Sequence, residues 1–205
     1  MLEQANLDTV TKVETNSENK FMYSFMCLGA CIEDFGKAIW PVIAIDGTHL
    51  KGSYKGVVFV AACKDGNNKI FPMAFGIGDK ENEESWMWFL TELYKTIGHP
   101  DNLMFIFNRN PIIPKSVSKA FPNASHGLCF FHITQNLKSN YKKTFTKDIC
   151  DIFTATTYMY RQSDYEKEMN ELLIVHPKVH QYVIEIGPEK IGVCSQPRKT
   201  IRYDD

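Results

Sequence analysis

The sequence predicts an α/β fold in which three antiparallel strands are followed by alternating strands and helices. Two observations support this prediction. Short β-branched runs bounded by turn residues come first, and segments with apolar residues at helical spacing separate the later runs. The chain has 205 residues, of which 44% are hydrophobic, so it can form one domain with an appendage. We expect a mixed five-stranded sheet with N-terminal and C-terminal helices.

The N-terminal part of the chain, residues 1–37, is expected to contain a polar segment and one helix. Met1–Asn19 is polar, and we expect it to be loosely held. The following segment, 21–35, should be a helix packed under the sheet, because its apolar residues recur at helical spacing. These residues are Phe21, Phe25, Leu28 and Ile32.

Three runs in the next part of the chain predict an antiparallel meander. Val42–Ile45 is β-branched, and Val57–Cys63 and Ile70–Gly76 have the same strand character. The last two are joined by Lys64–Lys69, which contains an Asp-Gly hairpin signal. Asp46 should therefore stand at the end of the first strand.

Strands and helices alternate after the meander. Asn82–Ser85 opens a helix that Gly98 ends, and the wholly apolar Leu103–Phe107 should be a central fourth strand. A short helix over Pro114–Phe121 and a fifth strand over His126–Phe131 follow. Later helices are expected from Ile133 onward, over Lys147–Tyr160 and over Ser163–Val175, before a tail without clear periodicity at Gly187–Asp205.

This order of elements is that of the ribonuclease-H-like fold. In that layout the first and fourth strands lie side by side, so the end of the fourth strand should approach Asp46. We expect the ribonuclease-H-like domain at residues 38–145 and a helical extension at 146–205. A fold alone does not establish a function, but it indicates where a site would lie.

Composition and charge limit the classes of function. The formal net charge is −1, so any nucleic-acid surface would have to be local. Met1–Thr15 lacks the apolar core of a signal peptide, and no run approaches the roughly 18 apolar residues of a membrane helix. We therefore expect a protein of the nucleus or cytoplasm with no membrane partner. Its six cysteines lack a Cys-x-x-Cys pair and should be reduced.

Asp46 is the most informative single residue. It directly follows the apolar run Pro41–Ile45, where an unpaired carboxylate is costly to bury. A divalent metal is the usual partner of such a carboxylate. The alternative interpretation is a turn residue before Gly47. As a metal ligand, Asp46 would need a second carboxylate nearby.

Several blocks of the chain resemble, in the same order, the catalytic region of plant Mutator-like element (MULE) transposases. The resemblance covers nearly all of the chain from about Phe25 onward, which makes it more specific than a single motif. The blocks are Asp46–Gly52 with Tyr54–Gly56, Asp65–Asn68 with Phe71–Gly76, Glu84–Leu90, Pro122–His132, Tyr165–Leu172 and Ile186–Lys190.

The resemblance implies a DDE transposase, in which three acidic residues hold two Mg²⁺ or Mn²⁺ ions for DNA strand cleavage and transfer. Asp46 corresponds to the first acid. Asn108 stands at the position of the second Asp, and Asn110 at that of a His. Arg202–Tyr203 matches a pair that precedes the third acid, a Glu, and the chain ends two residues later. We therefore expect the third acid to be missing and the chain to be truncated.

Asn108 can ligate a cation through its carbonyl, but it supplies no negative charge. We expect no tightly bound metal and an inactive remnant of a transposase. Two alternatives remain open. One is a domesticated DNA-binding or protein-interaction module, and the other is a residual metal-dependent nuclease. The nuclease would use Asp46 with Glu83, Glu84 or Asp79. DNA is the partner that the family implies, and a homo-oligomer remains open.

Two further sets of residues are candidates for binding. Lysines near the first acid and in one helical region would contact DNA phosphates, or else form a solvated face. They are Lys51, Lys55, Lys138, Lys142, Lys143 and Lys147.

Cys129 and His132 form the Cys-x-x-His motif, preceded by His126. A structural zinc site needs four ligands, and no obvious partner pair exists, so a core role for Cys129 is the alternative. His49 and His132 could also line the catalytic cleft, and a hydrogen-bonded structural His is the alternative that we favour for each.

Overall fold

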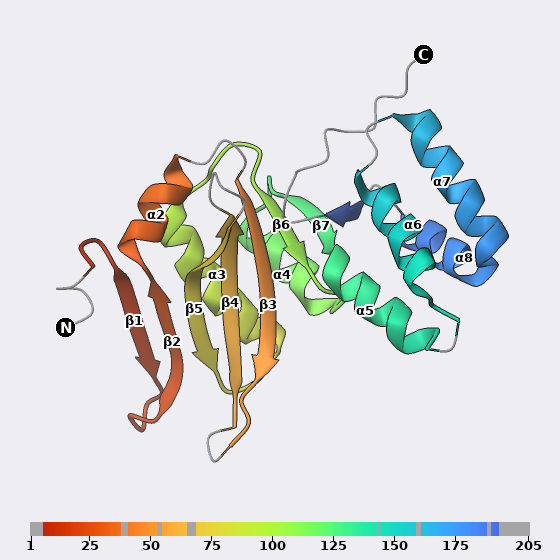
Figure 1. The fold of residues 1–205 in the computed structure, drawn as a ribbon. Coiled ribbons are helices and arrows are strands. Elements are labelled where there is room, and N and C mark those ends of the chain that lie inside the picture. The colour runs from red at the N-terminus through yellow and green to blue at the C-terminus, as the bar shows by residue number, and fades with distance from the viewer. Residues whose placement is uncertain are drawn as a thin grey trace. The chain divides into compact units, whose positions relative to one another are not determined.

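The computed structural model describes residues 6–37, 41–52, 55–64, 69–142, 144–158, 161–187 and 190–192. The chain divides into two compact units, Met1–His126 and Gly127–Asp205, which are described separately below. Figure 1 shows the elements of both. Within the described ranges, no helix is long and apolar enough to span a membrane.

The first unit is built on a mixed sheet whose described strands follow the order β1-β2-β5-β4-β3-β6. The strands β3, β4 and β5 form the expected antiparallel meander. As predicted, β6 lies beside β3, and the two run parallel with Ala44 opposite Ile106. The strands are β1 (Val10–Thr15), β2 (Phe21–Cys27), β3 (Val42–His49), β4 (Val57–Lys64), β5 (Ile70–Gly78) and β6 (Met104–Phe107).

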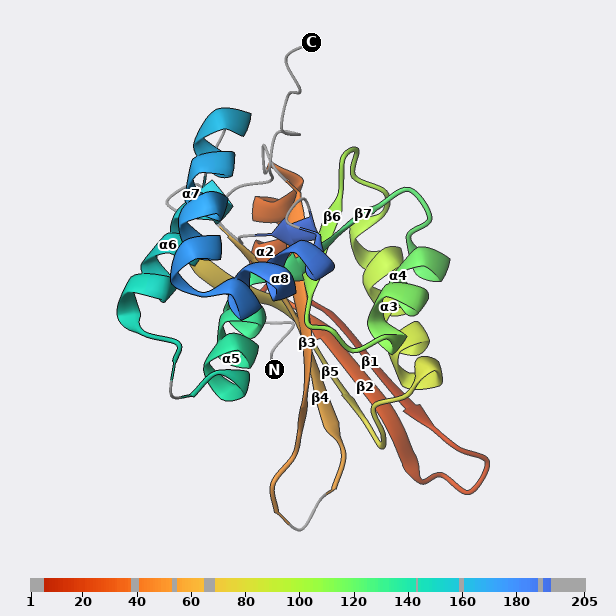
Figure 2. The same ribbon diagram turned by 90° about the vertical axis from the view of Figure 1, so that its right-hand side faces the viewer.

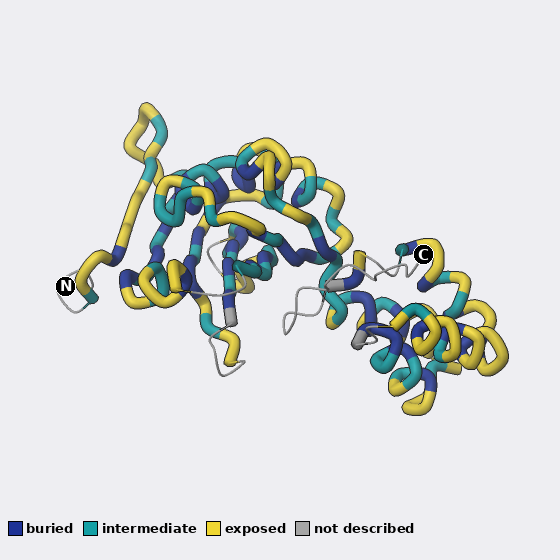
Figure 3. Tube along the Cα trace, turned by 90° about the horizontal axis from the view of Figure 1, so that it is seen from above, coloured by how far each residue is buried: buried dark blue, intermediate teal, exposed yellow. Residues whose placement is uncertain are grey.

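The N-terminal segment differs from the prediction. Phe21–Cys27 is strand β2, and the helix α2 begins only at Gly29 and ends at Gly36. The segment expected to be loosely held contains β1, which pairs with β2 and is largely exposed (Figure 3). Burial alternates along β2, with a period of two residues rather than 3.6. The prediction of five strands is therefore too low, because this hairpin extends the sheet.

One face of this sheet is covered by α3 (Glu83–Ile97) and α4 (Ile112–Ala120) (Figure 2). The aromatic core lies beneath α3: the ring of Phe59 is 4.7 Å from that of Trp86 and 5.7 Å from that of Phe89. A Cβ at Gly76 would lie 2.6 Å from the Phe89 ring, so glycine permits this close approach. The helix starts as predicted, because the Asn82 side chain accepts a hydrogen bond from the Ser85 amide at 2.9 Å.

The second unit is mainly helical. Its core is formed by fully buried apolar side chains, among them Leu137, Phe153, Leu172 and Val183. Strand β7 (Ser125–Cys129) pairs in parallel with the short β8 (Ile191–Gly192). The helices are α5 (Phe130–Asn140), α6 (Lys147–Tyr158), α7 (Gln162–Val175) and α8 (Pro177–Ile186).

Two boundaries in this unit depart from the prediction. The fifth predicted strand ends at Cys129 rather than Phe131, so α5 begins three residues before Ile133. The helix α8 was not predicted. Its first residue is Pro177, and proline is common at the first position of a helix. The predicted features at Asp65–Asn68 and Arg202–Tyr203 lie outside the described residues.

Candidate functional site

The sheet brings Asp46 and Asn108 together. Asp46 lies on β3, and Asn108 directly follows β6, the parallel neighbour of β3. The Nδ2 atom of Asn108 donates a hydrogen bond to Oδ1 of Asp46 at 2.9 Å. The expectation that the end of the fourth strand approaches Asp46 is therefore confirmed.

Asp46 lies within β3 rather than at its end. The strand continues to His49 because pairing with β4 continues past Asp46, which stands opposite Val60. Side chains alternate between the two faces of a strand. The neighbour Gly47 faces α3, since a Cβ there would lie 3.2 Å from the Trp86 ring. Asp46, which is half-buried, therefore points to the opposite face of the sheet.

Asn110 extends this contact to a second carboxylate. Its backbone amide donates to Oδ1 of Asn108 at 2.9 Å, and its Nδ2 donates to Oε1 of Glu81 at 2.8 Å. Its own Oδ1 accepts from the amide of Ile112 at 3.0 Å, at the start of α4. The four residues thus form one hydrogen-bonded chain in the order Asp46, Asn108, Asn110, Glu81, in which the backbone amide of Asn110 makes the middle link.

This network determines the orientation of both amide side chains. In Asn108 and in Asn110, the Oδ1 atom accepts from a backbone N–H, which can only donate. Each Nδ2 must therefore face its carboxylate, Asp46 in one case and Glu81 in the other. Asn108 consequently presents a donor to Asp46, where a metal-binding residue would present oxygen lone pairs.

Glu81 is a site residue that the sequence prediction missed. It lies between β5 and α3, one residue before the helix cap Asn82. Its Oε2 is also 3.9 Å from Nε2 of His49, on the last residue of β3. One feature of the sequence could have indicated Glu81. It follows the third predicted strand and precedes the helix, at the end of the sheet where β3 also ends.

The three acids proposed as partners of Asp46 behave differently. Glu83 forms ion pairs with Lys115 at 2.6 Å and Lys119 at 2.5 Å. Hydrogen bonds from these two lysines lower the pKa of Glu83 to about 2. Glu84 and Asp79 are exposed. The carboxylate that joins the Asp46 network is instead Glu81.

The residues present do not fit a two-metal site in this arrangement. Two divalent ions need several anionic oxygen ligands. Here the second position is neutral, its nitrogen faces Asp46, and its oxygen already accepts the amide of Asn110. Across the described ranges, no group of three or more His, Cys, Asp or Glu residues is arranged to hold a metal ion.

The candidate lysines that the structure describes are exposed, as DNA phosphate contacts would have to be. Lys51 and Lys55 belong to the first unit and lie between β3 and β4. In the second unit, Lys138 lies in the last turn of α5 and Lys142 lies just beyond that helix. Lys143 lies outside the described residues.

The Cys-x-x-His motif lies at the junction of a strand and a helix. Cys129 ends β7 and His132 lies in the first turn of α5, and both are half-buried. His126 packs against Phe107, with 5.5 Å between the ring centroids, and burial lowers the pKa of its imidazole. The five described cysteines, Cys129 among them, are free thiols.

This geometry defines a class of mixed α/β domain. In that class, a carboxylate on one strand lies close to the end of the parallel neighbouring strand. Residues 42–136, from β3 into α5, match the family model of the MULE transposase domain. This segment is therefore a MULE transposase domain. A comparison with curated proteins finds no match.

Proposed function

We propose that this chain is a transposase-derived DNA-binding domain that no longer cleaves DNA and needs no metal to hold its site together. The hydrogen bond from Asn108 to Asp46 is the observation that carries this proposal. The antiparallel meander with β6 parallel to β3 supports a ribonuclease-H-like fold for the domain.

The neutral residue at position 108 explains the loss of metal dependence. Two adjacent carboxylates repel each other unless a cation lies between them. The side-chain amide of Asn108 instead donates a hydrogen bond to the Asp46 carboxylate. A hydrogen bond to a charged group contributes about 1.5–3 kcal/mol to stability. The pair is therefore stable without a cation, and it lacks the charge that would hold two divalent ions.

DNA binding is the ancestral property that this arrangement leaves intact. Contacts to the phosphate backbone require exposed lysines but no catalytic metal. Lys138 and Lys142, four residues apart at the end of α5, are exposed and have no carboxylate partner in the described part of the chain. They are the proposed phosphate contacts.

The test is DNA binding measured in EDTA over a series of salt concentrations. Wild-type protein should bind duplex DNA at low salt, and Lys138→Glu with Lys142→Glu should weaken binding. Each lost phosphate contact should also lower the slope of log K against log salt by about 0.9.

Lys138→Glu and Lys142→Glu are also tested one at a time, and Lys167→Glu, at an exposed position on α7, is the control that matches each single variant in charge. Absence of binding at low salt would contradict the proposal, as would equal weakening by the control variant.

A further inference from the structure

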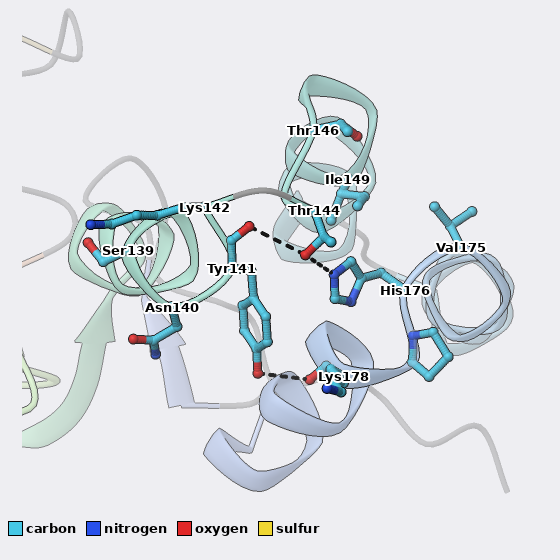
Figure 4. Close-up of a pocket in the computed structure, with 11 residues that line it drawn as sticks. Ser139, Asn140, Tyr141, Lys142, Thr144, Thr146, Ile149, Val175, His176 and Lys178 are labelled. Carbon is cyan, nitrogen blue, oxygen red and sulfur yellow. Dashed lines mark hydrogen bonds between the residues drawn. The ribbon is translucent and has the colours of Figure 1, made fainter.

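The helical unit contains a pocket of about 1000 Å³ that the Asp46 site does not involve (Figure 4). Its lining comes from the end of α5, the loop that follows, the start of α6 and the junction between α7 and α8. All of these segments belong to the second unit.

A network of hydrogen bonds holds one wall of the pocket in place. His176 Nδ1 accepts from the amide of Val179 at 3.2 Å, so Nε2 carries the proton of the neutral ring. Nε2 therefore donates to Oγ1 of Thr144 at 2.8 Å. Tyr141 donates its hydroxyl to the backbone oxygen of Lys178 at 3.3 Å, and its ring stands edge-on to His176. The wall is thus formed before any ligand arrives.

The charged side chains in the described lining of the pocket are all lysines. Its described lining includes Lys142 and Lys178 and no carboxylate. Neither lysine takes part in an ion pair within the described ranges, whereas Lys12, Lys95, Lys115 and Lys119 all do. Hydroxyl and amide groups of Ser139, Asn140 and Thr146 complete the polar part of the lining.

Lys178 also occupies an electrostatically unfavourable position. It lies in the first turn of α8, which contains no acidic residue, at the positive end of the helix dipole. A cation there is disfavoured unless an anion lies close by. The cavity, the two lysines that form no ion pair within the described residues, and the helix terminus therefore all indicate a negatively charged ligand.

We propose that this pocket binds a phosphate group, either of the DNA backbone or of a small phosphorylated molecule. Phosphate can accept hydrogen bonds from both lysines and from the hydroxyls of the lining. The inference that the phosphate belongs to DNA rests on the proposed function. The inference that the pocket binds a phosphate group does not.

The test is a titration of the full chain with pyrophosphate, followed by the imidazole NMR signals of His176 and by thermal stability. Sodium chloride at equal ionic strength serves as the reference. Pyrophosphate should shift the His176 signals and raise the melting temperature. Lys178→Glu should weaken binding at least about tenfold, the effect of losing one charge-assisted contact.

Lys178→Glu also places an acid at the start of α8, which favours the helix. Loss of binding would therefore not reflect unfolding, and a melting curve without ligand confirms this. Lys167→Glu, outside the pocket lining, should bind pyrophosphate like the wild type. Unchanged His176 signals, full binding by Lys178→Glu, or equal weakening by Lys167→Glu would each overturn the proposal.

A short single-stranded oligonucleotide distinguishes the two sources of phosphate. If it competes with pyrophosphate and Lys178→Glu weakens both, the ligand is the DNA backbone. If only pyrophosphate binds, the ligand is a small phosphorylated molecule. DNA binding on α5 is judged separately by Lys138→Glu, since Lys138 does not line the pocket. Failure of one proposal therefore leaves the other standing.

Discussion

Position 108 shows how one atom changes the chemistry of the site. An Asp and an Asn have nearly the same shape, but the Nδ2 of Asn108 donates to Asp46 where an aspartate oxygen would repel it. The same amide group is oriented through Asn110, which in turn contacts Glu81. A neutral side chain at this one position therefore makes the whole network compatible with the absence of a cation.

The variant Asn108→Asp should lower the free energy of unfolding by about 1–3 kcal/mol in EDTA, because Asp46 loses its donor and gains a like charge. Mn²⁺ should then restore stability to this variant but leave the wild type unaffected. Urea unfolding with and without Mn²⁺ measures both effects. Asn123→Asp makes the same change at an exposed position and should have little effect. An Asn108→Asp protein that is as stable as this control, with no response to Mn²⁺, would refute the interpretation of position 108.

At the scale of elements, the N-terminal hairpin is tied to α3 by polar contacts. Lys12 of β1 contacts Glu92 at 3.0 Å, and Trp88 donates a hydrogen bond to Glu14. Burial acts to raise the pKa of Glu92, but hydrogen bonds from Lys95 and Lys12 outweigh it, and the pKa is lowered. Because β1 is largely exposed, these side-chain contacts are important for holding it.

The lowered pKa of Glu92 makes this attachment sensitive to acid. A carboxylate whose pKa is lower in the folded state stabilises the protein above its ordinary value of 4.5, and this contribution is lost as the pH falls through the folded value. The unfolding free energy of the wild type should therefore fall more steeply below about pH 4.5 than that of Glu92→Gln. Parallel pH profiles from urea unfolding would show that Glu92 does not stabilise the hairpin.

The success of sequence-based prediction also varied by element. The meander and β6 were predictable, because their buried runs and turn residues allow few other interpretations. From residue 21 to residue 28 the apolar spacing fits a helix as well as a strand, and only the pairing of β2 with β1 and β5 decides for the strand. Asp46 and Asn108 could be brought together from strand order alone. Glu81 could not, because its contact depends on where the Asn110 side chain turns.

At the scale of the whole molecule, the net charge and the MULE transposase match at residues 42–136 lead to one account. The net charge of −1 means that any affinity for DNA must come from local groups of lysines, and those at the end of α5 are exposed. The MULE transposase match runs from β3 into α5 and includes the Asp46 network. It ends at residue 136, two residues before Lys138. We infer that the domain has the fold of a transposase, and that the side-chain amides of Asn108 and Asn110 donate hydrogen bonds to its two acidic residues, Asp46 and Glu81.

The most direct test of the central claim is a strand-nicking assay on supercoiled DNA in Mn²⁺. The account predicts that purified wild-type protein nicks no more DNA than a buffer control, and that Asp46→Ala behaves identically. Nicking by the wild type that disappears in Asp46→Ala would contradict the account, because it would show that Asp46 still holds a catalytic metal despite its hydrogen bond from Asn108.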